Sequence, residues 1–396
     1  PTLSAKEIIG NESQERMGLV LKPGDVDELV RIANRERAPI YIVGEITEDH
    51  RFVFESERTK EKPMDLELAH MFGKPPKTIM NDKSLDTKYK ELSYDFSELP
   101  RYLEGVMQLE AVACKDWLTN KVDRSVTGKI ATQQCAGPLQ LPLNNLGAVA
   151  LDYRGKKGYA TSIGHAPVAA MVDAAAGSVL SIAEALTNIV WAPMPDKMRS
   201  ISLSANWMWP CKNKGEDARL YEAAKAASDF AVELGINIPT GKDSLSMTQK
   251  YKDEVVYAPG TVIISAAGEV TDINKIVEPV LNPDPDTRLI YLDLAKDDFK
   301  LGGSSFAQFS TRIGSQAPTV TDPKYFLKAF NLIQSLIEEG MILAGHDVSA
   351  GGLITTIMEM CYANTSGGVE LDITGIPGDT IPVAFSEKPG VIIQVK

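Results

Sequence analysis

The chain has 396 residues, of which 44% are hydrophobic and 24% charged, enough sequence for two or three domains with globular cores. Its net charge is −12, whereas nucleic-acid-binding proteins usually carry an excess of basic residues. We therefore expect no nucleic-acid partner. The 4 cysteines include no C-x-x-C pair and the N-terminus shows no signal sequence, which favours a cytoplasmic protein without a zinc site or a disulfide framework.

The first 59 residues have a βαβ-like pattern. We expect a strand at 17–21, a helix from about Val26 to Arg35 and a strand at 40–43. Residues 60–98 are charged, contain prolines and show little periodicity, so we expect a linker lying over a surface.

Residues 99–280 form the largest block, with predicted helices near 99–109 and 217–234. Between them, residues 174–195 carry Glu184 as their only charged residue before Asp196 and could be mistaken for a membrane span. Their serine, threonine, asparagine and proline residues make a poor bilayer helix. We therefore predict a helix buried in a globular core and no membrane contact.

This predicted helix carries one narrow polar stripe, formed by Ser181, Glu184, Thr187 and Asn188 at three- and four-residue spacing. A carboxylate that enters a core must be paired or bind a metal. Glu184 and Asn188 would present two oxygen ligands from consecutive turns. The alternative is that the stripe is only the wet edge of an amphipathic helix.

Residues 285–396 begin a further block with a strand at 288–293, and their most informative segment is 342–361. A short apolar run ends in His346, Asp347 and Ser349 and then turns through Gly351 and Gly352 into a helix. Paired glycines let a ligand approach the backbone, a helix N-terminus favours an anion, and Asp347 supplies an oxygen suited to Mg²⁺. The segment predicts a phosphate site; the alternative is a turn in which Asp347 and Ser349 only cap the helix.

A short repeat links the two ends of the chain. Segments 11–21 and 386–395 each lead from polar, acidic residues into an apolar strand, as one element of a duplicated domain would. We interpret residues 1–59 as the tail of a first copy. We also expect the strands at 17–21 and 391–395 to expose apolar edges, because their neighbours would be missing.

Further polar segments follow one another along the chain, and their order is informative. They are 123–128 (DRSVTG), 137–142 (GPLQLP), 164–167 (GHAP), 184–188 (EALTN), 204–208 (SANWM), 241–247 (GKDSLSM), 262–266 (VIISA) and 346–349 (HDVS). In this order they resemble the large, single-chain phosphoribosylformylglycinamidine synthases of purine biosynthesis. Segments 11–16 (NESQER) and 73–77 (GKPPK) also fall where that family has them.

The resemblance implies an α+β or α/β fold made of tandem aminoimidazole-ribonucleotide-synthetase-like units, each with a barrel-forming N-terminal domain and an α/β C-terminal domain. Residues 1–59 would be the C-terminal part of the first-unit α/β domain and 60–98 the linker. Residues 99–280 would be the second-unit N-terminal domain, and 285–396 its C-terminal domain, truncated.

The resemblance also implies an ATP-dependent ligase of the glutamine amidotransferase type. The family converts formylglycinamide ribonucleotide, ATP and glutamine to formylglycinamidine ribonucleotide, ADP, phosphate and glutamate. The implied cofactors are Mg²⁺ and ATP or ADP. No glutaminase nucleophile and no first-unit ATP loop is recognisable, so we expect the chain to be an inactive fragment whose partners are the first-unit and glutaminase domains.

Carried over by position, Glu184, Asn188 and Asp347 match the family's Mg²⁺ ligands, and Ser349 matches a nucleotide contact. Asn144 falls at a nucleotide contact that is usually a small residue, and Asn145 replaces a metal-binding aspartate. Ala350 replaces an aspartate before the nucleotide-facing Gly351 and Gly352. No catalytic residue is assigned.

Two alternative functions remain open. One is another ATP-dependent member of the same superfamily, such as an aminoimidazole ribonucleotide synthetase or a thiamine-phosphate kinase. The other is a non-catalytic nucleotide-binding scaffold.

Overall fold

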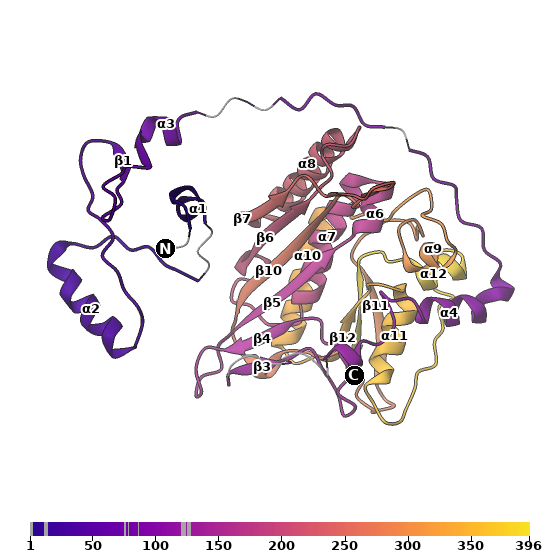
Figure 1. The fold of residues 1–396 in the computed structure, drawn as a ribbon. Coiled ribbons are helices and arrows are strands. Elements are labelled where there is room, and N and C mark those ends of the chain that lie inside the picture. The colour runs from indigo at the N-terminus through magenta and orange to yellow at the C-terminus, as the bar shows by residue number, and fades with distance from the viewer. Residues whose placement is uncertain are drawn as a thin grey trace. The chain divides into compact units, whose positions relative to one another are not determined.

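The computed structural model describes residues 3–11, 15–74, 77, 79–85, 87–119, 124 and 128–396 (Figure 1). Most of the 123–128 motif lies outside these residues, as do parts of the 11–16 and 73–77 motifs. The chain divides into two compact units, Pro1–Ile79 and Met80–Lys396.

The first unit contains short elements around one two-stranded sheet. They are α1 (Ala5–Ile9), the 3₁₀ helix η1 (Pro23–Asp25), α2 (Val26–Arg35), β1 (Arg51–Phe54), β2 (Met64–Glu67) and α3 (Leu68–Phe72). The helix predicted at 26–35 is confirmed as α2.

The strands predicted at 17–21 and 40–43 are not formed. Apart from half-buried Ile40, their side chains are exposed, with Met17 at 87% and Val43 at 94%. A strand is stable only beside a hydrogen-bonded neighbour, and β1 and β2 form the only sheet in the described part of this unit.

The second unit begins within the segment predicted to be a linker. From Met80 onward the chain lies against this unit, since Asp82 accepts the N–H of Gly215 and Ser84 Oγ donates to Glu222 at 2.6 Å. Further along, the Tyr94 ring meets Phe306 edge to face. The segment predicted to be a linker also includes β2 and α3 of the first unit.

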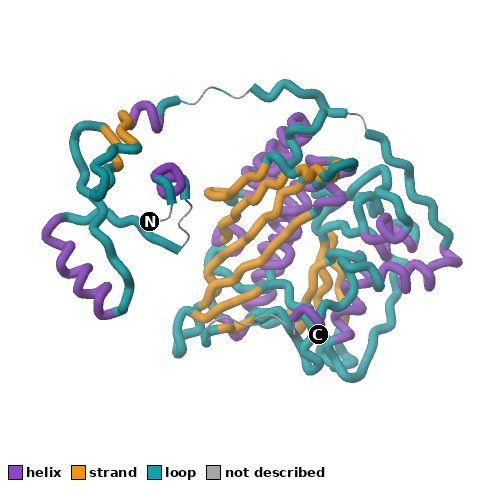
Figure 2. Tube along the Cα trace, in the orientation of Figure 1, coloured by secondary structure: helices purple, strands orange, loops and turns teal. Residues whose placement is uncertain are grey.

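A six-stranded mixed sheet dominates the second unit, with strand order β3-β4-β5-β10-β6-β7 (Figure 2). All neighbours are antiparallel except β6 and β7, which are parallel. The strands are β3 (Ile130–Thr132), β4 (Gly147–Ala150), β5 (Gly158–His165), β6 (Ile201–Met208), β7 (Asn237–Ser244) and β10 (Thr261–Val270). The hairpin of β8 (Thr248–Lys250) and β9 (Val255–Tyr257) is separate from this sheet.

Helices cover one face of this sheet, with α7 (Ala174–Ile189) packed on β5 and β10. Asp173 caps α7 by accepting the N–H of Ala176 at 2.9 Å. Gly164 on β5 permits the close packing, because a Cβ there would lie 2.2 Å from the backbone oxygen of Ser181. The other helices and turns in this part of the chain are η2 (Phe96–Glu98), α4 (Leu99–Met107), α5 (Asp116–Thr119), α6 (Pro167–Val172), η3 (Lys197–Ser200), α8 (Glu216–Leu234) and η4 (Ile273–Lys275). Of these, α6 and α8 pack on α7, whereas α4 packs on α9 further along the chain. The buried helix predicted within 174–195 is confirmed as α7.

The rest of the second unit is built on a three-stranded antiparallel sheet of order β11-β13-β12. Its elements are β11 (Arg288–Asp293), α9 (Ser305–Phe309), α10 (Pro323–Glu338), β12 (Ile342–Asp347), α11 (Gly352–Tyr362), α12 (Thr380–Phe385) and β13 (Gly390–Val395). β13 lies in the centre of the sheet and pairs with a strand on both sides. The expectation of an exposed edge at 391–395 is therefore wrong.

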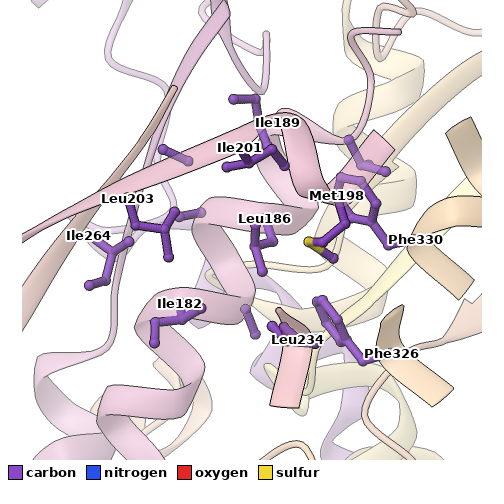
Figure 3. Packing of buried hydrophobic residues seen from close by; sticks show 14 of the residues in the cluster. Ile182, Leu186, Ile189, Met198, Ile201, Leu203, Leu234, Ile264, Phe326 and Phe330 are labelled. Atoms are coloured by element: carbon purple, nitrogen blue, oxygen red, sulfur yellow. The ribbon is translucent and has the colours of Figure 1, made fainter. Parts of the chain in front are cut away.

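One hydrophobic core joins the two sheets (Figure 3). Apolar side chains from α7, η3, β6, α8 and β10 meet Phe326 and Phe330 of α10, and Leu186, Phe326 and Phe330 are fully buried. Gln334 of α10 is also fully buried. Its Nε2 donates to the carbonyls of Val190 and Ala192, and its Oε1 accepts the N–H of Met194 at 2.9 Å. This side chain satisfies three backbone groups of the turn after α7, which would otherwise be buried without partners.

We predict that Gln334→Leu lowers the free energy of unfolding by roughly 2–5 kcal/mol, because it leaves those backbone groups unpaired at a cost of about 1–3 kcal/mol each. Lys328→Gln, on the exposed side of the same helix, is the control and should change the free energy of unfolding by less than about 0.5 kcal/mol. Urea denaturation of both variants measures the difference, and equal midpoints would contradict the assigned role of Gln334.

No helix in the described residues is both long and apolar enough to cross a bilayer.

Candidate functional site

The predicted site residues come from three places in the second unit. Glu184 and Asn188 lie on α7, Asp347 ends β12, and Asn145 precedes β4. The structure brings these segments together where α7 meets β12. Ser349 Oγ donates to Glu184 Oε1 at 3.0 Å, and Asn145 Nδ2 donates to the carbonyl of Gly345 at 3.3 Å.

Asp347 is buried, with 2% of its surface exposed. Its Oδ1 lies 3.4 Å from His346 Nδ1, but its Oδ2 has no hydrogen-bond partner within the described residues. A buried carboxylate oxygen without a partner is costly. An unpaired carboxylate oxygen of this kind has the chemistry of a cation ligand.

Glu184 is held in place by two donors. The N–H of His165 donates to Oε2 at 2.7 Å, and Ser349 donates to Oε1. Burial, and after it the negative charge of Asp347, raise the pKa of Glu184 to about 8, although these two donors oppose the shift. Two carboxylates that repel each other in a poorly solvated place form a site that a cation would stabilise.

The polar stripe on α7 is not a wet edge, because two of its members are buried. Ser181 Oγ donates to the Gly177 carbonyl and Thr187 Oγ1 to the Glu184 carbonyl of the same helix. Asn188 Nδ2 instead lies 3.4 Å from the Ile163 carbonyl of β5. Glu184 and Asn188 are thus the stripe residues whose side chains reach beyond α7.

His346 and Glu359 belong to the same cluster, although the sequence pattern did not assign them. His346 Nδ1 contacts Asn145 Oδ1, and Nε2 lies 3.0 Å from Glu359 Oε2. Burial lowers the pKa of His346, but the hydrogen bonds to Asp347 and Glu359 outweigh it and raise the pKa to about 9. His346 is therefore an imidazolium that donates from both ring nitrogens. The sequence feature that could have indicated this cluster is Glu359, which is the one charged residue in the apolar helix α11.

The glycine turn before α11 has the backbone that its sequence requires. Gly351 and Gly352 have φ angles of +88° and +75°, and a Cβ on Gly352 would lie 2.6 Å from the backbone of Phe385. The N–H of Gly351 donates to Glu387 at 2.7 Å, and that of Gly352 donates to the Ser349 carbonyl at 3.0 Å. These two N–H groups are paired within the protein. The role of the two glycines is therefore to allow the positive φ angles and the close packing of this turn.

Asn144 lies beside Asn145 but is used differently. Its Nδ2 donates to the carbonyls of Gln133 at 2.6 Å and Cys135 at 3.1 Å, which fixes the loop before β4.

No three His, Cys, Asp or Glu side chains gather as a metal-binding group among the described residues. A cation at this site would therefore rely on two carboxylates and neutral oxygens. A cavity of about 580 Å³ lies elsewhere, lined in part by Tyr94, Asp293 and Lys388, and includes none of the predicted site residues.

Two family models match the chain. The FGAR-AT PurM_N-like domain matches residues 114–269, and the C-terminal domain of AIR synthase related proteins matches residues 1–57 and 285–393. The second model thus matches both ends of the chain.

Phosphoribosylformylglycinamidine synthases are similar to the whole chain. The Homo sapiens protein is 38% identical over 418 aligned positions and the Dictyostelium discoideum protein 39% over 422. Both alignments cover 100% of this chain, which spans 31% and 30% of the respective relatives.

Solved structures share the fold. T. maritima PurL complexed with ADP matches with a TM-score of 0.62 at 14% identity, covering 100% of this chain and 55% of that chain. The same protein complexed with ATP gives 0.61 at 15% identity, with 99% and 54% covered. The predicted mixed α/β fold of the synthetase-like unit is confirmed.

The charge state of His346 is directly measurable. We predict that the His346 imidazole titrates near pH 9 in NMR spectra, and that its signals are absent in His346→Gln. The folded-state pKa lies above the unfolded value of about 6.5, so this group stabilises the fold fully below pH about 6.5 and loses that effect as the pH rises through about 9. Titration at or below about pH 6.5 would contradict the imidazolium assignment.

Proposed function

Because this chain belongs to the phosphoribosylformylglycinamidine synthase family along its whole length, we propose that it provides the part of such an enzyme that binds Mg²⁺ and ATP or ADP. The whole enzyme would convert formylglycinamide ribonucleotide, ATP and glutamine to formylglycinamidine ribonucleotide, ADP, phosphate and glutamate. The first-unit and glutaminase domains would be its partners, and the cytoplasm its location.

One observation carries this proposal: the Oδ2 of buried Asp347, beside Glu184, has no hydrogen-bond partner in the described part of the chain. Two carboxylate oxygens and amide oxygens are the ligands that Mg²⁺ prefers. We assign Glu184, Asn188, Asp347 and Asn145 as the metal ligands. The Asn145 oxygen has two lone pairs, so it can accept from His346 and still face a cation.

The nucleotide contacts are assigned to the residues around this cation. Ser349 offers a hydroxyl, while Gly351 and Gly352 keep side chains out of the turn. Asn144 holds the loop that carries Asn145 and lies at the edge of the site. When bound, Mg²⁺ neutralises phosphate charge and orients the phosphates for transfer.

Two neutral residues favour a second candidate function. Asn145 and Ala350 stand where the resemblance implies aspartates. The site therefore has fewer carboxylates with which to bind a metal. A cleft that only holds a nucleotide, without catalysing its reaction, would need fewer negative charges around a metal. The second candidate is therefore a non-catalytic nucleotide site within the same enzyme.

We predict that Asp347→Asn and Glu184→Gln each weaken Mg-dependent ADP binding at least about tenfold, because each removes a full charge beside a dication. Titration calorimetry with ADP, with and without Mg²⁺, measures the change. Glu233→Gln on the exposed side of α8 is the control and should bind as the wild type does. If both site variants keep wild-type affinity, the metal assignment is wrong.

A gain of charge should act in the opposite direction. Asn145→Asp is expected to tighten Mg-ADP binding by on the order of 1 kcal/mol, roughly fivefold, with part of the new charge screened by His346. Asn144→Asp adds the same charge one residue away and should not tighten binding. Equal effects at both positions, or none at Asn145, would place Asn145 outside the metal shell.

A further inference from the structure

The connector between α12 and β13 ties several loops together through consecutive side chains. Ser386 Oγ donates to the Lys300 carbonyl at 2.7 Å, and Lys388 Nζ donates to Asp293 Oδ2 at 2.9 Å and the Asp297 carbonyl at 2.8 Å. Between them, Glu387 points to a different pair of groups. Its Oε1 accepts the N–H of Gly351 at 2.7 Å and the N–H of Ser305 at 2.8 Å.

These two N–H groups lie at two separate helix starts. Gly351 is the N-cap residue of α11 and has no side chain with which to cap it, and Ser305 is the first residue of α9. One oxygen of Glu387 therefore supplies an acceptor to both, as a capping side chain would. It connects the Ser349–Gly352 turn to the Gly302–Ser305 turn.

The Ser349–Gly352 turn is continuous with the candidate site. The N–H of Gly352 donates to the carbonyl of Ser349, whose hydroxyl donates to Glu184. Thr356 Oγ1, one turn into α11, donates to the carbonyl of Asp347 at 3.0 Å. A change in the position of Gly351 would therefore displace both Ser349 and Asp347.

We propose that Glu387 is a positioning residue for the Mg-nucleotide site, acting as the hydrogen-bond acceptor that fixes the Ser349–Gly352 turn against the Gly302–Ser305 turn. The affinity part of this proposal rests on the proposed function. Its geometric part, the hydrogen bonds from Glu387 to the two N–H groups, does not depend on the proposed function. An acceptor role requires an oxygen at this place, which glutamine also supplies and methionine does not.

The test compares Glu387→Met with Glu387→Gln, which have similar volume but differ in that oxygen. Ser386→Ala is the matched control, since it removes a hydrogen bond of the same connector to a different loop. Amide hydrogen exchange at Gly351 and Ser305 is measured without nucleotide, and Mg-ADP affinity by calorimetry. Circular dichroism checks that each variant is folded.

We expect Glu387→Met to speed exchange at both amides at least about tenfold and to weaken Mg-ADP binding by a similar factor, because the N–H groups of Gly351 and Ser305 lose their shared acceptor. Glu387→Gln and Ser386→Ala should stay within about threefold of the wild type in both measurements. If Glu387→Met does not fold, Glu387→Gln still tests the proposal, because exchange at Gly351 and Ser305 that is more than about tenfold faster in Glu387→Gln would overturn it.

Unchanged exchange and affinity in Glu387→Met would overturn the proposal, and so would a Glu387→Gln variant as impaired as Glu387→Met, since charge rather than the acceptor would then matter. Absence of Mg-ADP binding in the wild type would instead reject the proposed function. In that case, fast amide exchange in Glu387→Met, with normal exchange in Glu387→Gln, would still show that Glu387 fixes the two turns through its hydrogen bonds.

Discussion

The burial of two carboxylates, Glu184 and Asp347, at the junction of the two sheets is the constraint on which the candidate site depends. Asp347 is 2% exposed and has one oxygen without a hydrogen-bond partner among the residues that the structure describes, while burial raises the pKa of Glu184 to about 8. Taking such groups out of water is unfavourable unless charge is compensated. The neighbouring imidazolium of His346 compensates part of that charge, and a divalent cation would compensate the rest.

The surrounding fold holds these groups with backbone contacts rather than with long surface side chains. Gly164 lets α7 lie close to β5, so that the N–H of His165 reaches Glu184. Gln334 attaches the turn after α7 to α10, which keeps the two sheets in one core. The site is therefore positioned by elements that are among the most buried in the unit, which favours a preformed geometry.

Local patterns in the sequence were sufficient for much of this fold. The apolar face of residues 26–35 and the strand, glycine turn and helix of 342–361 are formed as predicted. The strands predicted at 17–21 and 40–43 are not, because strand formation depends on a neighbour that local periodicity cannot reveal.

The site could be predicted only in part for the same reason. Glu184, Asn188 and Asp347 stand out as polar residues in apolar segments. The contacts of His346 with Asn145 and of Glu387 with Gly351 join residues far apart in the chain, and no spacing rule connects them. The central position of β13 is likewise a property of the assembled sheet.

The chain spans about 30% of the length of its relatives, so the clearest test addresses the site that this chain itself contains. Crystals soaked with Mn²⁺ and ADP give an anomalous signal that locates the cation directly. We predict a peak within coordination distance of Asp347 Oδ2 and the Glu184 carboxylate, with the ADP phosphates beside Ser349. A cation and nucleotide bound elsewhere, with Asp347 Oδ2 uncoordinated, would contradict it.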